Sequence, residues 1–372
     1  MTPKRWAFLF FAVFVLLGFA ISAQYLISTQ SQCIDLKPAK RAEVTLRALD
    51  DNLESIEAVA LQTAEDQEEW HQKTAFVPPE SDLGGWVTII KVDPNLNTGL
   101  LAKKKNPILL PAQAETKIFL MVRNAWKKPH TLRVIFLLDF QQVPIHGPHG
   151  VTDYYDFPVM ASQEDQALAL TLTALPPGFH QLSILWIADP ENTSSDSVYR
   201  LLQQKSFQEE RFDLWVGINA PPTATLVFED AKIGQDASNR FGGIEFVASP
   251  TDKTNEPLTS LVLKPSDEHC LNLRLFNAKP GTDALYTDSV PLFIAVFWND
   301  KLEQIVNYDL SASSPENLTL RLRVQAPSEA GSYQLSAAVF TFSGYSQFDG
   351  TGTRVGYPIG TFTRRILVAV RP

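Results

Sequence analysis

The pattern of hydrophobic and polar positions is clearest in a stretch that occurs twice. Residues 108–125, ILLPAQAETKIFLMVRNA, align without a gap to residues 261–278, LVLKPSDEHCLNLRLFNA, 153 positions later. In both copies apolar side chains alternate along the middle of the stretch, which predicts a strand with one buried face. The alternating residues are Ile118, Leu120 and Val122 in the first copy and Leu271, Leu273 and Leu275 in the second.

A second match at the same offset indicates that the repeat extends over a whole domain. It pairs Gly178, Gln181, Leu182 and Ser183 with Gly331, Gln334, Leu335 and Ser336. Solenoid repeats have periods of up to about 50 residues, so a repeat of this length indicates a duplicated domain.

Further alternating or strongly apolar runs fill each copy, separated by turns rich in Pro and Gly. Short strands of this kind, with no helical period between them, predict an all-β fold of two tandem antiparallel β-sandwiches. The paired runs are 132–140 and 292–298, 168–172 and 318–322, and 212–218 and 365–370, with turns at 176–178 and 327–331.

This arrangement resembles the immunoglobulin-like or fibronectin-III-like sandwich domains of exported bacterial proteins. The resemblance covers about 280 residues and concerns the fold. Trp298 lies on a suitable strand, but no cysteine pair brackets it, so the immunoglobulin Cys…Trp…Cys signature is absent. The resemblance therefore implies an architecture and no site residue.

The N-terminus carries an uncharged run, residues 6–23, directly after Lys4 and Arg5. With one glutamine tolerated, the run extends over 6–27, long enough for a helix to span a bilayer. Positive charges before the run place the N-terminus in the cytoplasm and the remainder outside. The alternative is a cleaved signal peptide, with Ala20 and Ser22 before the cut, which makes the protein secreted. If the apolar run is retained as an anchor, the chain is predicted to be a single-pass protein of the cell membrane.

The segment between this helix and the first repeat has an ambiguous pattern. Apolar residues at helical spacing favour a short helix or stalk, and the alternative is a pair of strands at 44–46 and 59–61. The apolar residues are Leu46, Leu49, Leu53, Ile56 and Ala60. The predicted organisation is a cytoplasmic tail (1–5), a transmembrane signal-anchor helix (6–27), a membrane-proximal stalk or helical segment (28–80), a first sandwich (81–218), a linker (219–222) and a second sandwich (223–372).

Charge and cysteine usage exclude some classes of function. With 41 acidic and 32 basic residues the formal net charge is −9, which argues against binding to nucleic acid. No cysteine spacing suits zinc or a redox CxxC motif, and no cofactor is predicted. Cys270 is expected on an outer strand face, where outside the cell it pairs with Cys33 or another chain, or stays a free thiol.

Two further places are candidate binding or metal sites. Phe119 and Met121 are expected on the outer face of their strand, covered by the 44–61 segment or by a partner, or else are isolated surface residues. A loop that holds imidazoles and carboxylates could bind a divalent metal ion, or is an ordinary polar loop. Its residues are His146, His149, Asp153 and Asp156.

Each repeat also contains a long loop before its last strand, at 188–210 and 343–360. Long loops in compact domains are often binding loops. Tyr345, Phe348 and Tyr357 in the second loop could stack on a sugar or anchor a protein; the alternative is a flexible hairpin loop.

The sequence contains no GxSxG, HExxH or P-loop motif, so we expect a protein that is not an enzyme. The leading hypothesis is a membrane-anchored, extracytoplasmic interaction or scaffold protein whose partner is a protein of the cell envelope. The first alternative is a surface protein that binds glycans through the long-loop aromatics. The second is a metal-dependent hydrolase centred on His146 and His149.

Overall fold

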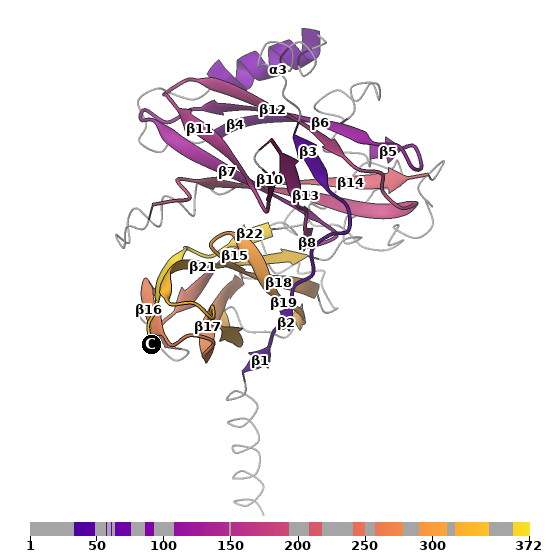
Figure 1. Ribbon diagram of the computed structural model, residues 1–372. Coiled ribbons are helices and arrows are strands. Elements are labelled where there is room, and N and C mark those ends of the chain that lie inside the picture. The colour runs from indigo at the N-terminus through magenta and orange to yellow at the C-terminus, as the bar shows by residue number, and fades with distance from the viewer. Residues whose placement is uncertain are drawn as a thin grey trace, which may run out of the picture.

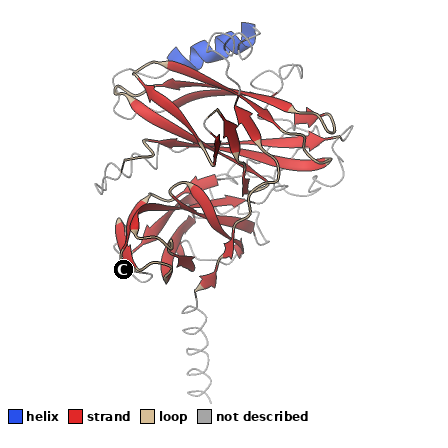
Figure 2. Cartoon of the chain, in the orientation of Figure 1, coloured by secondary structure: helices blue, strands red, loops and turns tan. Residues whose placement is uncertain are grey.

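The described part of the chain forms two β-sandwiches stacked on one another, with a helix at the far end of the first (Figure 1, Figure 2). A computed structural model describes residues 33–48, 57, 61, 64–75, 86–92, 108–148, 150–192, 208–217, 241–249, 257–277, 290–310, 317–341 and 360–372. Within these ranges no helix is long and apolar enough to cross a membrane. The predicted anchor at 6–27 and linker at 219–222 lie outside them.

The first sandwich packs two sheets face to face. One has the strand order β10-β9-β3-β12-β6-β4 and the other β11-β7-β13-β14-β5, with β8 paired to β7. The strands are β3 (Leu46–Ala48), β4 (Trp86–Val92), β5 (Ile108–Leu110), β6 (Thr116–Asn124), β7 (His130–Leu138), β8 (Gln141–Gln142), β9 (Ile145–Gly147), β10 (Gly150–Thr152), β11 (Tyr155–Met160), β12 (Asp165–Leu172), β13 (Gly178–Ala188) and β14 (Gln208–Val216).

The second sandwich has the sheets β1-β20-β17-β15 and β16-β23-β21-β18-β19-β2, with β22 paired to β21. Its strands are β1 (Ile34–Asp35), β2 (Lys37–Pro38), β15 (Phe241–Val247), β16 (Ser260–Leu263), β17 (Glu268–Asn277), β18 (Val290–Trp298), β19 (Lys301–Leu310), β20 (Asn317–Gln325), β21 (Gly331–Thr341), β22 (Gly360–Phe362) and β23 (Ile366–Val370).

The repeat is visible in the topology. In the first copy 108–125 forms β5 and β6, and β5 pairs in parallel with the last strand, β14. In the second copy 261–278 forms β16 and β17, and β16 pairs in parallel with the last strand, β23. The alternating residues of β6 and β17 are buried in the two sandwich cores. The prediction of an all-β fold with two β-sandwiches is confirmed.

The segment predicted as a stalk forms part of both sandwiches instead. Residues 33–48, called the strap below, supply β1 to β20, β2 to β19, and β3 to both β12 and β9. The alternative of a strand near 44–46 is close to β3, where Leu46 is fully buried in the first core. Open sheet edges explain the difference, because an edge offers unpaired backbone groups to any nearby extended segment. Neither sandwich is therefore complete within 81–218 or 223–372.

Helix α3 (Ala64–Ala75) covers the outer face of the β4–β6 sheet in the first sandwich. Leu61 and Trp70 pack there against Met121, so the cover comes from the chain itself, from the end of the predicted 44–61 segment and the helix beyond it. A buried ion pair between Lys91 on β4 and Asp66 on α3, 3.0 Å long, fixes the helix to the sheet.

Candidate functional site

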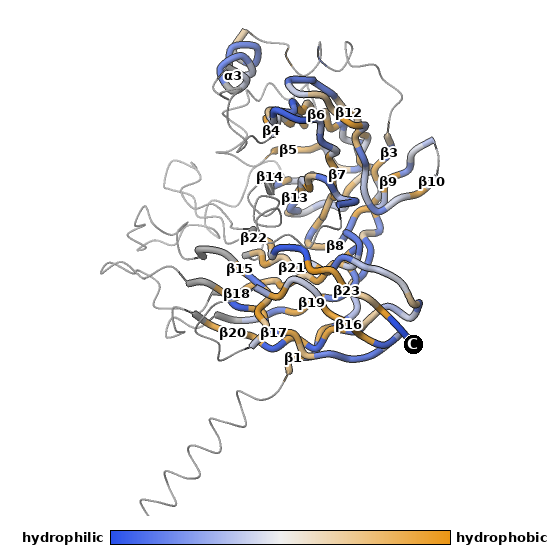
Figure 3. The backbone as a smooth tube through the Cα atoms, turned by 90° about the vertical axis from the view of Figure 1, so that its left-hand side faces the viewer, coloured by the Kyte–Doolittle hydropathy of each residue, from blue (hydrophilic) through white to orange (hydrophobic). Residues whose placement is uncertain are grey.

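The most elaborate arrangement of side chains lies where the two sandwiches meet. Strands β7 and β13 of the first face β18 and β21 of the second, and β8 and β22 lie at this boundary in two views (Figure 1, Figure 3). The sheet registers make the contributing positions equivalent: Ile135 pairs with Leu185 as Ala295 pairs with Ala338. The equivalent pairs at the junction are Arg133/Phe293, Ile135/Ala295, Leu137/Phe297, Phe140/Asp300, Leu185/Ala338 and Ile187/Phe340.

Because equivalent residues contribute from both sides, the junction has pseudo-two-fold symmetry. In a two-fold interface every contact occurs twice, with the two positions exchanged between the two sides. Here Phe140 of the first sandwich contacts Phe293 of the second, and Asp300 of the second contacts Arg133 of the first. The turn position (Phe140 or Asp300) thus contacts the strand position (Phe293 or Arg133) of the other sandwich in both halves of the junction.

Two-residue hairpin turns position Phe140 and Asp300. Asp139 and Phe140 connect β7 to β8 with φ values of 49° and 63°, and Asn299 and Asp300 connect β18 to β19 with φ values of 48° and 65°. Positive φ at both central positions is typical of a type I′ turn, which matches the twist of the flanking strands. A left-handed conformation costs about 1–2 kcal/mol for a residue such as Phe140, so its burial must offset this cost.

The first turn residue fastens each hairpin to the neighbouring strand. Asp139 Oδ1 accepts a hydrogen bond from the backbone N–H of Gln181 at 2.8 Å, and Asn299 Oδ1 accepts one from Gln334 at 2.8 Å. The backbone N–H groups of the two turn residues donate in return to the carbonyls of Gln181 and Gln334. The repeated Gln181/Gln334 of the sequence therefore marks a duplicated clamp that holds each turn in place.

Asp139 also favours the charged form of a histidine. His180 Nδ1 lies 2.7 Å from Asp139 Oδ2, and Nε2 lies 2.9 Å from the carbonyl oxygen of Pro176. Both partners are acceptors, so an imidazolium, which donates from both nitrogens, satisfies them best. The hydrogen bond to Asp139 raises the pKa of His180 above its usual value, against the opposing effect of burial.

The first half of the junction is apolar. The ring of Phe140 stacks on Phe293 with centroids 4.5 Å apart and lies 5.8 Å from Phe340. These residues belong to one cluster in which Ile135, Leu185 and their neighbours from both sandwiches are buried. Burial of a large apolar side chain stabilises by roughly 1.5–3 kcal/mol, so separation of the sandwiches is costly.

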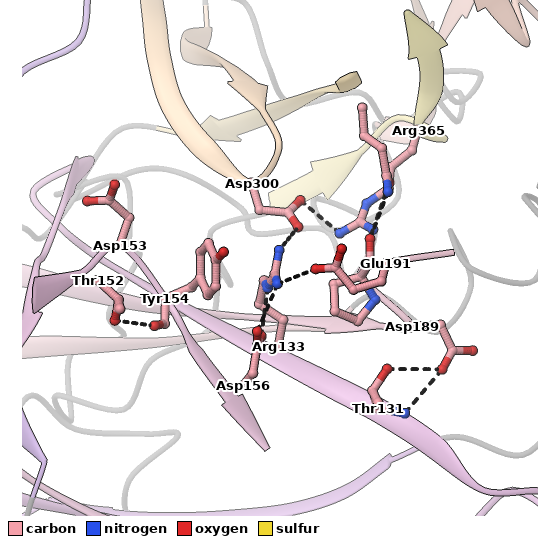
Figure 4. A network of polar contacts seen from close by, with 12 residues as sticks. Thr131, Arg133, Thr152, Asp153, Tyr154, Asp156, Asp189, Glu191, Asp300 and Arg365 are labelled. Atoms are coloured by element: carbon pink, nitrogen blue, oxygen red, sulfur yellow. Dashed lines mark hydrogen bonds and ion pairs between the residues drawn. The ribbon is translucent and has the colours of Figure 1, made fainter. Parts of the chain in front are cut away.

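The second half of the junction is ionic (Figure 4). Asp300 lies between two arginines: its Oδ2 accepts from Arg133 Nη1 at 3.0 Å and its Oδ1 from Arg365 Nη2 at 2.8 Å. All three side chains are at most 8% exposed. Arg365 donates further to the carbonyl oxygen of Pro190 in the first sandwich. A buried carboxylate with two charge-assisted partners ties both sandwiches together.

Arg133 is the centre of this ionic half. Its guanidinium makes two hydrogen bonds to Asp156, one to Glu191, and lies 3.6 Å from the centroid of the Tyr154 ring. Burial lowers the pKa of Arg133, but the hydrogen bond to Asp156 and the nearby negative charges raise it more. The guanidinium therefore stays charged, and burial raises the pKa of Tyr154, so its phenol stays neutral.

The chemical difference between the halves makes the junction specific. If two second-sandwich faces paired with each other, Asp300 would lie against Phe293 twice and its buried carboxylate would lose Arg133, while it would keep Arg365 of its own sandwich. Removal of one partner from a buried ion pair costs about 3–5 kcal/mol. The face of the second sandwich is thus complementary to that of the first and not to itself.

The strap is joined covalently to the second sandwich. Cys33 and Cys270 form a disulfide, with Cα atoms 6.0 Å apart, next to the pairing of β1 with β20. The strap reaches the first sandwich through Arg41, whose guanidinium lies 2.7 Å from Asp153. Gln142 adds a further link between the sandwiches, because its amide nitrogen donates to Asp300 O and its amide oxygen accepts from Leu302 N.

Other residues singled out in the sequence have the following places. Phe119 is buried beside Ala169, and Met121 lies beneath Trp70. His146 lies on β9, the carboxylates of Asp153 and Asp156 are paired with arginines, and His149 lies outside the described residues. Among the described residues no group of three or more His, Cys, Asp or Glu side chains could hold a metal ion. The aromatics Tyr345, Phe348 and Tyr357 lie outside the described ranges.

Two dipeptides in the sequence are a partial signal for the junction. The dipeptides Asp139-Phe140 and Asn299-Asp300 each interrupt two apolar runs, which is a hairpin signal. They are 160 positions apart, seven more than the offset of 153, so the gap-free alignment of the repeat does not pair them.

The comparisons with known proteins show likeness of fold alone. No protein-family model matches the chain, and no curated protein does. Among solved structures, the CARDB domain of the PF1109 protein from Pyrococcus furiosus is 13% identical at a TM-score of 0.23, over 36% of this chain and 88% of that one. The PapD-like domain 7 of human CEP192 is 11% identical at 0.20, over 39% and 90%. A β-glucosidase from Listeria innocua is 12% identical at 0.21, over 37% and 17%. The sheets themselves make the chain a β-sandwich protein, and these likenesses say nothing of its function.

Proposed function

We propose that this chain is a membrane-anchored, extracytoplasmic scaffold protein whose two sandwiches bind a protein partner as one rigid unit. The observation that carries the proposal is the junction, where a shared apolar cluster and a buried ionic cluster join the sandwiches. Interfaces between domains of one chain are usually modest and polar, and relative motion is the default. The junction of this chain has a buried apolar core, so we expect little relative motion of the two sandwiches.

Rigidity favours a scaffold because it lowers the entropic cost of binding. A pair of domains at a fixed angle presents both surfaces in a fixed arrangement. When a partner binds both surfaces, little conformational freedom between the domains is lost. In the junction, Arg133 and Arg365 both donate hydrogen bonds to Asp300. Such mutual pairing suits a structural lock better than a substrate site.

The proposed location follows from the sequence and is compatible with the disulfide. Residues 6–27 are long and apolar enough for a signal anchor, and disulfides persist mainly outside the reducing cytosol. A disulfide between Cys33 and Cys270 supports an extracytoplasmic setting for both sandwiches.

The test is chemical crosslinking of the full chain in native membranes, followed by identification of crosslinked proteins. Wild type is compared with Asp300→Asn, which weakens the junction, and with Glu191→Gln, a matched control whose side chain is 82% exposed. A partner retained by wild type and the control but reduced in Asp300→Asn supports a rigid scaffold. Equal capture by all three contradicts it. Binding to a glycan array with no protein partner would favour the glycan-binding alternative instead.

A further inference from the structure

We infer that the second sandwich, although it comes last in the sequence, lies next to the membrane and that the first sandwich is held away from it. This inference rests on the proposed membrane anchor. It goes beyond that proposal, because it decides which surface of the protein is available to a partner in the surrounding space. Three features of the strap carry it: a covalent bond, a short reach and a direction.

The covalent bond sets the first fixed point of the chain after the anchor. Cys33 is bonded to Cys270 on β17, with their Cα atoms 6.0 Å apart. Only six residue steps separate residue 27, the end of the predicted anchor, from Cys33. An extended chain spans at most about 3.6 Å per residue, so this stretch reaches no further than about 22 Å. Cys270 therefore lies within about 28 Å of the anchor, close to the membrane surface.

The direction of the strap puts the first sandwich beyond the second. From Cys33 the strap passes along β20 and β19 of the second sandwich before β3 joins β12 of the first. Figure 1 shows β1 and the C-terminus at one end of the molecule and α3 at the other. The junction holds this arrangement rigid, so α3 and the sheet beneath it face away from the membrane.

The disulfide strengthens an attachment to the second sandwich that otherwise consists of short strands, partly buried apolar residues and polar contacts. Strands β1 and β2 have two residues each, and the Asp35–Arg323 ion pair is exposed at both ends. Exposed ion pairs contribute roughly 0–1 kcal/mol. The first residue of the strap with no exposed surface is Leu46. It lies 19 residues beyond the anchor, a reach of about 68 Å. That reach lets either sandwich approach the bilayer.

The experiment measures how close each sandwich lies to lipid headgroups. The full chain is reconstituted in phosphatidylcholine vesicles with acceptor-labelled headgroups. A donor dye is attached through p-azidophenylalanine in place of Lys264, exposed in the turn before β17, or of Gln72, exposed on α3. We expect energy transfer from position 264 to be at least twofold stronger than from position 72. Equal transfer, or stronger transfer from position 72, overturns the inference.

Two controls separate this inference from the proposed function. Flotation with the vesicles tests the anchor: a chain that stays at the bottom of the gradient refutes the anchor and the orientation together. A chain that floats but shows reversed transfer refutes the orientation alone. In the double variant Cys33→Ser/Cys270→Ser, the difference between the two positions should shrink. An unchanged difference would show that the disulfide does not set the orientation.

Discussion

Replacement of Asp300 by asparagine should weaken the junction more than any single surface change. Asn keeps the shape of the side chain and tolerates the positive φ of 65° at this turn position, whereas Ala adds left-handed strain of about 1–2 kcal/mol. The change removes the negative charge between two buried guanidinium groups, those of Arg133 and Arg365. The loss of stability in Asp300→Asn therefore measures the contribution of the ionic half of the junction and not that of the hairpin turn.

The magnitude follows from what each arginine keeps. Arg133 retains Asp156 and Glu191, so its charge stays compensated. Arg365 retains hydrogen bonds to the carbonyl oxygen of Pro190 and to Gln334, neither of which carries a charge. Loss of one partner of a buried ion pair costs about 3–5 kcal/mol. We expect about 3 kcal/mol for Asp300→Asn, since Asn still accepts one hydrogen bond.

The assay is equilibrium unfolding in urea, followed by tryptophan fluorescence and by limited proteolysis. Wild type should unfold with the sandwiches coupled, and Asp300→Asn should lose about 3 kcal/mol and show separate transitions. Glu191→Gln, which removes an exposed partner of Arg133, should change stability by less than about 1 kcal/mol. If Asp300→Asn lies within about 0.5 kcal/mol of wild type, the ionic half does not stabilise the junction and the reasoning is refuted.

Three further perturbations test other parts of the fold. Because the pKa of His180 is raised in the folded state, its contribution to stability is full below the unfolded value near 6.5 and is lost as pH rises through the folded value. Unfolding free energies of His180→Gln between pH 5 and 8 should lack this component, and an unchanged pH dependence would contradict it. Lys91→Met leaves Asp66 in a buried site without its ion-pair partner and should cost about 3–5 kcal/mol, seen as faster proteolysis at α3. The double variant Lys91→Met/Asp66→Leu should recover most of that loss, and no recovery would count against the ion-pair account. In Cys33→Ser/Cys270→Ser, hydrogen exchange by mass spectrometry should rise at residues 34–38, and protection equal to wild type would mean that strand pairing alone holds the strap.

The sequence contained the information for the sandwich cores because their signal is local. Alternation along 116–124 and 268–277 gives the buried face of each strand whatever its neighbours are. The duplication added the domain organisation, since two similar patterns fold in similar ways. Together these predicted an all-β pair of sandwiches and the strands that carry their cores.

Attachments between distant segments were the part that the sequence did not reveal. The strap was predicted as a stalk, because Leu46 fits a helical stripe as well as a short strand, and only the open edges of both sandwiches select the strand. Met121 was expected to lie under a cover or alone on the surface, and only the packing assigns Trp70 of α3 as its cover.

The junction shows the same division between local and long-range information. A hairpin at Asn299-Asp300 is readable from the sequence, because positive φ at both positions is a local preference of Asn and Asp. That Asp300 would contact Arg133, 167 positions earlier, is not readable, because a carboxylate on a turn is ordinarily solvated. The sequence by itself therefore determined two sandwiches with known cores, and the tertiary structure alone decided how they are joined, since burial of a charge depends on what packs against it.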